Sequence, residues 1–214
     1  VKITVRFNLI LVVDQKYARP GTEMTASVSN APAGTEFAYQ WSVETKGQSQ
    51  TVSSTASYTP KTGDLNKFIT VKATLNGALV DTLKIYCSKL PVVYINTLDG
   101  YDITSKEVYK DAVMRVQGND AFQDETLLYE GDVEIRGRGN STWSTSYSKR
   151  PYKLKLGSKT NLLGFGTSKH WALLANFMDE SLIRNTTSYD LAGKMGITPH
   201  LKSAHVELIL NDVY

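Results

Sequence analysis

The chain has 214 residues, a size that fits one large domain or two small ones. Its hydrophobic content of 41% and charged content of 21% are those of an ordinary globular protein. The chain contains no apolar run of about 18 residues, the length that a membrane span needs. The single cysteine, Cys87, excludes an internal disulfide, and the net charge of +3 is too small to indicate nucleic-acid binding by itself.

Residues 1–88 show the alternation of apolar and polar side chains that is typical of β-strands. Apolar residues recur at every second position in four runs: 1–13, 24–28, 37–43 and 69–75. A fifth run, 79–87, follows the same pattern at Leu79, Leu83, Ile85 and Cys87. Asn76–Gly77 separates the last two runs and predicts a hairpin. No helical period occurs before residue 88, so we predict an all-β sandwich.

Trp41 lies in the third of these runs. Its neighbours Tyr39 and Val43 fall on the same face, which favours a core position over the alternative of a ligand-stacking residue. Cys87 is predicted to be a buried apolar residue. A tryptophan in the third strand is similar to the core tryptophan of immunoglobulin-like domains. Residues 1–88 therefore resemble the disulfide-free Ig-like modules of bacterial surface proteins.

Residues 89–214 are predicted to form a second domain. Six strands are expected, at 91–97, 111–117, 127–137, 152–156, 170–177 and 204–210. Asp179 is the expected N-cap of one main helix, with Glu180 in its first turn and Gly196 at its end. The apolar face of this helix is expected to consist of Leu182, Ile183, Tyr189, Ala192 and Met195.

The last predicted strand, 204–210, carries inward-facing apolar residues and is followed by a turn at Asn211–Asp212. No residues remain in the chain for a partner strand, and an unpaired apolar edge is a liability. We therefore expect the second domain to be incomplete at its C-terminus. We also expect its terminal strand to be poorly paired, or paired with another molecule through this edge.

Residues 136–159 combine a strong basic charge with two glycines. They contain seven basic residues and no acidic ones: Arg136, Arg138, Lys149, Arg150, Lys153, Lys155 and Lys159. The glycines of RGRGNST (136–142) would let backbone N–H groups approach phosphate oxygens closely. The residues alone leave three interpretations open, namely a structural basic turn, an anion site and a nucleic-acid patch. The lysines are equally compatible with solvated strand charge.

Residues 90–214 contain a series of short motifs in a distinctive order: IRGRGNSTW…SKRPYKLKL…LLGF…HWALLANFMDESLIRN…LAGKMGI…VELILNDVY. This series resembles the CotH family, the spore-coat protein H-like atypical protein kinases. Arg150 stands where the family has the second lysine of K-K-P-Y, and Asp212 stands at the glycine of N-G; both departures are mild. The resemblance implies a divergent kinase fold that binds ATP and a divalent metal and phosphorylates serine on partner proteins. It places the catalytic and metal-binding acidic residues beyond Tyr214, so this chain alone is expected to lack kinase activity.

The resemblance favours the anion site among the three interpretations. The predicted nucleotide- or phosphate-binding residues are Arg136, Arg138, Asn140, Ser141, Lys149, Arg150 and Lys153. Asp179, Arg184 and Asn185 form the D-x-S-x-x-R-N motif and are predicted either to support this site or to hold the helix to the sheet. A simple N-cap role would also explain Asp179. The three histidines lack the spacing of a zinc site, and no metal ligand is predicted in this chain.

The predicted architecture is an all-β Ig-like sandwich (1–88) followed by an incomplete α+β CotH/kinase-like domain (89–214) with antiparallel strands and one main helix. The predicted function is that of the N-terminal part of a CotH-like kinase, with ATP and Mg²⁺ in the whole protein.

The expected location is extracellular or at a bacterial cell surface, with an upstream lipid anchor as one option. Expected partners are a protein substrate or a cell-surface protein, with no nucleic acid and no membrane span. The alternative is a non-enzymatic structural or adhesion protein. A glycan-binding module would require Tyr39, Trp41 and Trp143 to be exposed.

Overall fold

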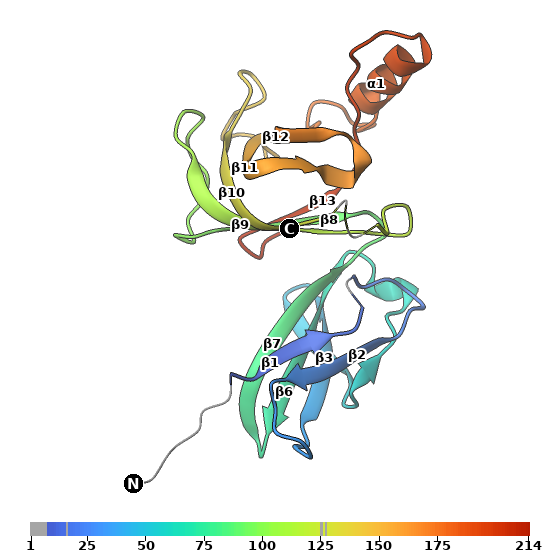
Figure 1. The fold of residues 1–214 in the computed structure, drawn as a ribbon, viewed down its shortest axis with the longest axis vertical. Coiled ribbons are helices and arrows are strands. Elements are labelled where there is room, and N and C mark those ends of the chain that lie inside the picture. Colours follow the sequence, from blue (N-terminus) through green and yellow to red (C-terminus); the bar gives the residue numbers. More distant parts are fainter. Residues whose placement is uncertain (1–7, 16, 125, 127) are drawn as a thin grey trace. The chain divides into compact units, whose positions relative to one another are not determined.

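The computed structural model describes residues 8–15, 17–124, 126 and 128–214. The chain divides into two compact units, Val1–Lys89 (unit 1) and Leu90–Tyr214 (unit 2), which are drawn in Figure 1. The described residues form mostly β-strands, and α1 (Arg184–Lys194) is the only α-helix among them. The expectation of a β-rich protein with one main helix is therefore confirmed.

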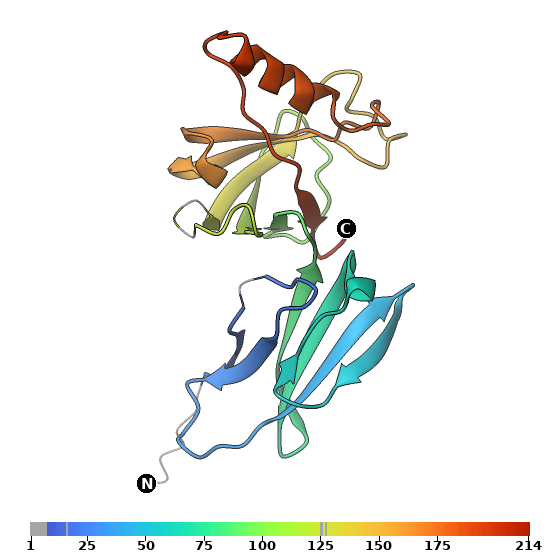
Figure 2. The same cartoon turned by 90° about the vertical axis from the view of Figure 1, so that its right-hand side faces the viewer.

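Unit 1 consists of two sheets that share one hydrophobic core (Figures 1 and 2). The three-stranded sheet has the order β1 (Ile10–Val13), β2 (Met24–Ser29), β5 (Ser57–Tyr58). The four-stranded sheet has the order β4 (Gln48–Ser53), β3 (Ala38–Thr45), β6 (Lys67–Leu75), β7 (Ala78–Cys87). A short 3₁₀ turn, η1 (Thr62–Asp64), precedes β6.

The core of unit 1 lies where the alternation predicted it. Trp41 and Cys87 are each 0% exposed, so both predicted core positions are confirmed. The indole Nε1 of Trp41 donates a hydrogen bond to the carbonyl of Thr55 at 3.1 Å, which satisfies its only polar atom. With Trp41 buried, the glycan-binding interpretation loses its central aromatic residue.

The hairpin between β6 and β7 has the turn that Asn76–Gly77 predicted. Both residues have positive φ, 51° and 81°, as a two-residue type I′ turn requires. The pairing register shifts between Ala73 and Thr74, and this shift leaves Leu79 61% exposed. Leu79 was expected on the inner face, so that prediction is wrong. Positions 1–7 of the first predicted strand lie outside the described residues.

Unit 2 is built on one six-stranded sheet, coloured green to red in Figure 1. Its order is β12 (Thr167–Leu173), β11 (Tyr152–Asn161), β10 (Tyr129–Gly137), β9 (Lys110–Gln117), β8 (Val92–Thr97), β13 (Glu207–Leu210). A 3₁₀ turn, η3 (Leu162–Gly164), joins β11 to β12. One face carries the core, to which Ile135, Met114 and Leu154 contribute buried side chains.

The terminal strand is paired, contrary to expectation. β13 runs parallel to β8, with Cα partners from Glu207↔Val92 to Leu210↔Ile95. The prediction of a poorly paired strand is therefore wrong. The predicted antiparallel pairing holds for β8 to β12, and only the pair of β13 with β8 departs from it among the described strands. The predicted turn follows at Asn211 and Asp212, whose φ angles are 49° and 60°. The prediction considered only a partner strand that follows β13 in the sequence. The actual partner, β8, precedes β13 by more than 100 residues.

The helix begins later than predicted. α1 starts at Arg184, with Ile183 as its N-cap residue, because Leu182 adopts a positive φ of 60° that an α-helix cannot contain. Glu180 therefore lies outside the helix. Gly196, with φ 74°, ends it as expected. None of the helical residues is buried, so the predicted apolar face does not pack into a core among the described residues.

Candidate anion-binding site

The basic segment spans the end of β10, a long connection and the start of β11. In the antiparallel register, Arg136 lies opposite Lys153 and Glu134 lies opposite Lys155. These four side chains share the face of the sheet opposite to that of Ile135 and Leu154, which are 0% and 2% exposed. The strand pairing thus brings together cations that lie 17 or more positions apart in the sequence.

Packing explains both glycines of RGRGNST. A Cβ on residue 137 would lie 2.5 Å from two atoms of the Trp143 indole ring. Gly139 has a φ of 89°, a conformation that side chains rarely adopt, and its missing Cβ leaves room for the Thr142 hydroxyl. The half-buried Trp143 packs against the core and meets Tyr152 edge-on at 5.8 Å. The chain therefore folds back over its own glycines.

Two backbone N–H groups of this loop already have partners. The N–H of Gly137 donates to the carbonyl of Ser105 at 2.8 Å, and the N–H of Arg138 donates to that of Pro151 at 3.2 Å. Neither group remains available for a phosphate oxygen. The loop also offers an anion the charge of its side chains.

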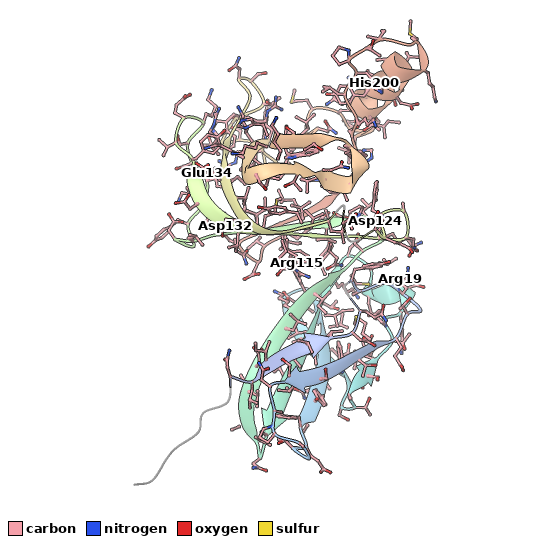
Figure 3. All side chains as sticks on the ribbon, in the orientation of Figure 1. Arg19, Arg115, Asp124, Asp132, Glu134 and His200 are labelled. Carbon is pink, nitrogen blue, oxygen red and sulfur yellow. The ribbon has the colours of Figure 1, made fainter. Side chains whose placement is uncertain are left out.

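Several of the seven basic side chains are engaged within the fold. Lys155 pairs with Glu134 at 2.6 Å, and this hydrogen bond and charge raise the pKa of the lysine above its ordinary value. Glu134 is labelled in Figure 3. The Arg150 guanidinium lies over the Trp143 ring at 5.1 Å. The charge of Lys155 is therefore compensated by a carboxylate that lies two positions before the segment, although residues 136–159 themselves contain none.

Lys159 does not line the cleft described below. Three other cations form what we call the basic cluster: Arg138, Lys149 and Lys153. Their side chains make no hydrogen bond or ion pair with any part of the chain that the structure describes. All three line one cleft of about 1120 Å³ in unit 2, together with Arg136. Glu107 is the only carboxylate among the lining residues that the structure describes. The cleft also reaches residues on the core face, such as Met114. The candidate site is the part of the cleft that the basic cluster and Arg136 line.

The other predicted site residues divide into two groups. Asn140 and Asn185 line the cleft, whereas Ser141, Arg150, Asp179 and Arg184 do not. The cleft also includes two lysines that the sequence analysis missed, Lys106 and Lys202. Each lies more than 25 positions from the basic segment, and neither belongs to a motif, so only the fold could associate them with it.

The D-x-S-x-x-R-N motif forms the entrance to α1. The Asp179 carboxylate accepts hydrogen bonds from the Ser181 hydroxyl at 2.6 Å and from the Arg184 N–H at 2.8 Å, and it lies 3.4 Å from the Arg184 Nε. The Ser181 hydroxyl, followed by the Arg184 N–H, lowers the pKa of this carboxyl. Asp179 therefore satisfies the first helical N–H from outside the helix, which is a capping role at a different position from the predicted one.

A second set of contacts fixes the same entrance. Asn185 donates to the side-chain oxygen of Asn176 at 2.7 Å, and Asn176 donates to the carbonyl of Leu182 at 3.2 Å. The same carbonyl lies 3.0 Å from Nε2 of His205, which must carry the proton because a carbonyl can only accept. Asp179, Arg184 and Asn185 thus hold the start of the helix through local contacts. The two predicted roles, supporting the site and holding the helix to the sheet, stay predictions.

The chemistry available to the cleft is the binding of an anion. Cations without internal partners stabilise a phosphate or carboxylate by charge-assisted hydrogen bonds. Within the described ranges no three His, Cys, Asp or Glu side chains are grouped so that they could hold a metal ion. Mg²⁺ is commonly held by one or two carboxylates together with substrate phosphates, so ATP and Mg²⁺ in the whole protein stay a prediction. No helix in the same ranges is long and apolar enough to cross a membrane.

Comparison with protein families supports the resemblance. The family described as CotH kinase protein matches residues 135–214. The match begins inside β10 and extends through β13, so it includes the basic cluster and the entrance to α1. The expected resemblance to the CotH family is therefore confirmed for this segment, and the chain contains a CotH-like part.

Other comparisons add little. No curated protein matches the chain. A solved structure of mouse nectin-like molecule 4, its full ectodomain of Ig1 to Ig3, is 12% identical with a TM-score of 0.24. The similarity covers 78% of this chain and 61% of the ectodomain, so the chain spans about three fifths of that protein's length. With a TM-score this low, the description of unit 1 depends on its own strands and core.

Proposed function

We propose that unit 2 belongs to a CotH-like atypical protein kinase and that the basic cluster binds the phosphates of ATP. The observation that carries the proposal is that Arg138, Lys149 and Lys153 line one cleft without a partner among the described residues. Clustered positive charge repels itself and is stabilised by a bound anion. The match of residues 135–214 to a family described as kinase protein makes a nucleotide the anion to test first.

The strand geometry supports the same proposal. In kinases, a strand lysine contacts the phosphates while a neighbouring turn covers them. Lys153 lies on β11, and Arg138 lies in the connection that follows β10. Both emerge next to the Trp143-packed turn, whose glycines keep it compact. The strand supplies one cation in a rigid position, and the turn supplies another.

We also propose that unit 1 is an Ig-like module carried by a surface or secreted protein. Its support is the buried Trp41 between a three-stranded and a four-stranded sheet, without any disulfide. A non-enzymatic adhesion protein with the same units is the second candidate function. Nucleotide binding distinguishes the two, because an adhesion platform has no use for ATP.

ATP titration of this chain by calorimetry tests the main proposal. Alanine at position 138, 149 or 153 should weaken binding about tenfold each, since a charge-assisted hydrogen bond is worth about 1.5–3 kcal/mol. Lys159→Ala is the matched control, because Lys159 is an exposed β11 lysine that does not line the cleft. Binding should also weaken with rising salt. If ATP does not bind, or if all three variants bind ATP like the unmodified chain, the proposal is wrong.

A further inference from the structure

The turn formed by residues 105–109 lies between β8 and β9 and is attached to the end of β10. Within the turn, the Ser105 hydroxyl accepts hydrogen bonds from the N–H groups of Glu107 and Val108, both at 3.0 Å. The Ser105 carbonyl accepts from the N–H of Gly137 at 2.8 Å. These bonds fix a segment that lies about 30 positions before the basic loop in the sequence.

Arg136 makes the principal side-chain attachment to this turn. Its Nη1 donates to the carbonyl of Lys106 and, at 3.3 Å, to that of Gly137. Its guanidinium carbon lies 5.0 Å from the centre of the Tyr109 ring. Its Nε is buried without a partner among the described residues. Arg136 is thus attached to the turn by one hydrogen bond and one ring contact, and its side chain also lines the cleft.

Lys106 is carried by the turn into the cleft that contains the basic cluster. Its carbonyl is held by Arg136, whereas its own ammonium group makes no hydrogen bond or ion pair with any described residue. A fixed backbone places the Cα of Lys106 and limits where its side chain can reach. Lys106 therefore has the property that defines the basic cluster, although it belongs to a distant part of the sequence.

We propose that Lys106 is a fourth phosphate-binding cation and that Arg136 is a positioning residue, which acts on the ligand by holding the 105–109 turn. The proposal rests on the nucleotide-binding function and deepens it. It reassigns Arg136, since the sequence analysis expected a direct contact with phosphate. An arginine fits there because its planar guanidinium bonds the carbonyls of Lys106 and Gly137 through Nη1 while its carbon lies over the Tyr109 ring, and the compact ammonium of a lysine has a different shape and reach.

A thermodynamic cycle on ATP affinity tests the proposal, with Lys106→Ala, Arg136→Ala and the double variant measured in this chain. Each single variant should lose about tenfold in affinity. If Arg136 acts through Lys106, the double variant should also lose only about tenfold, because the two changes remove the same contact. Arg136→Ala combined with Lys149→Ala should instead lose about a hundredfold. Arg136→Lys should not restore affinity, although it keeps the charge.

The outcomes separate this proposal from the function on which it rests. If ATP does not bind, or if the three basic-cluster variants bind normally, both fail. If those variants lose affinity while Lys106→Ala does not, only the present proposal is overturned. Additive losses for Lys106→Ala and Arg136→Ala would make Arg136 a direct ligand and overturn its positioning role. If Arg136→Ala does not fold, Lys106→Ala decides, because it keeps the backbone carbonyl that Arg136 binds.

Discussion

The indole ring of Trp143 occupies the space that a side chain at Gly137 would need, since a Cβ there would lie 2.5 Å from its atoms Cη2 and Cζ2. This contact closes the first part of the connection between β10 and β11, residues 137–143. The loop is therefore shaped by an aromatic side chain packed on a glycine. The cations near that contact are the ones that we propose bind an anion.

Gly137→Ala should destabilise unit 2 by about 1–3 kcal/mol, because the added methyl group overlaps the Trp143 ring and neither backbone nor indole can move freely. Urea unfolding measures the effect. Gly157→Ala is the matched control, since an added Cβ on this exposed β11 glycine meets nothing within 4 Å. Equal stability of the Gly137 and Gly157 variants would contradict the packing explanation.

Asn211→Ala should destabilise unit 2 by about 1–3 kcal/mol. The Asn211 side-chain oxygen accepts from the N–H and the hydroxyl of Thr97, at 2.9 and 3.1 Å. Thr97 is 6% exposed, so its N–H would lose its partner away from water.

Asp212→Gly should be neutral or stabilising by up to about 1 kcal/mol, because it relieves a positive φ of 60°. Thermal unfolding of the two variants should give opposite or clearly different shifts.

Asp179 should make the stability of unit 2 depend on pH in the acid range. Its pKa is lowered in the folded state, so its stabilising contribution is complete above the ordinary aspartate value of about 3.9. The contribution is lost as the pH falls through the lowered folded-state pKa. Asp179→Asn should therefore be less stable than the unmodified chain at pH 7, and the difference should shrink below pH of about 4. A difference that is constant from pH 7 to pH 3 would exclude this role.

Cys87 should not react with a thiol reagent in the folded chain at pH 8. Burial raises the pKa of its thiol to about 12, with a further contribution from the charge of Asp64, and the residue is 0% exposed. The thiolate is the reactive form, so reaction requires unit 1 to open. The rate should rise with urea in parallel with unfolding, and the urea-unfolded chain should react completely. Rapid reaction of the native chain would contradict the buried position.

Much of unit 1 could be predicted because its signals are local. Alternation along 24–28, 37–43 and 69–75 predicted both the strands and their buried faces, and Asn76–Gly77 predicted the turn. Leu79 departs from the pattern because a register shift is a property of two strands together. The helix start failed for a related reason. Asp179 is a good capping residue, but the chain turns through Leu182 before the helix begins.

By itself, the sequence determined the β-rich architecture, the positions of most strands, the buried Trp41 and Cys87, and the presence of a CotH-like segment. These depend on residue periodicity and on motif order, which are properties of a single chain read in one direction. Only the tertiary structure decided which cations are engaged, since the β10–β11 register pairs Lys155 with Glu134 and leaves Lys153 without a partner among the residues that the structure describes. It also decided that Lys106 joins the cleft and that β13 pairs with β8. Charges and strand edges find partners by distance in space, and that distance is set only when strands far apart in the sequence pair.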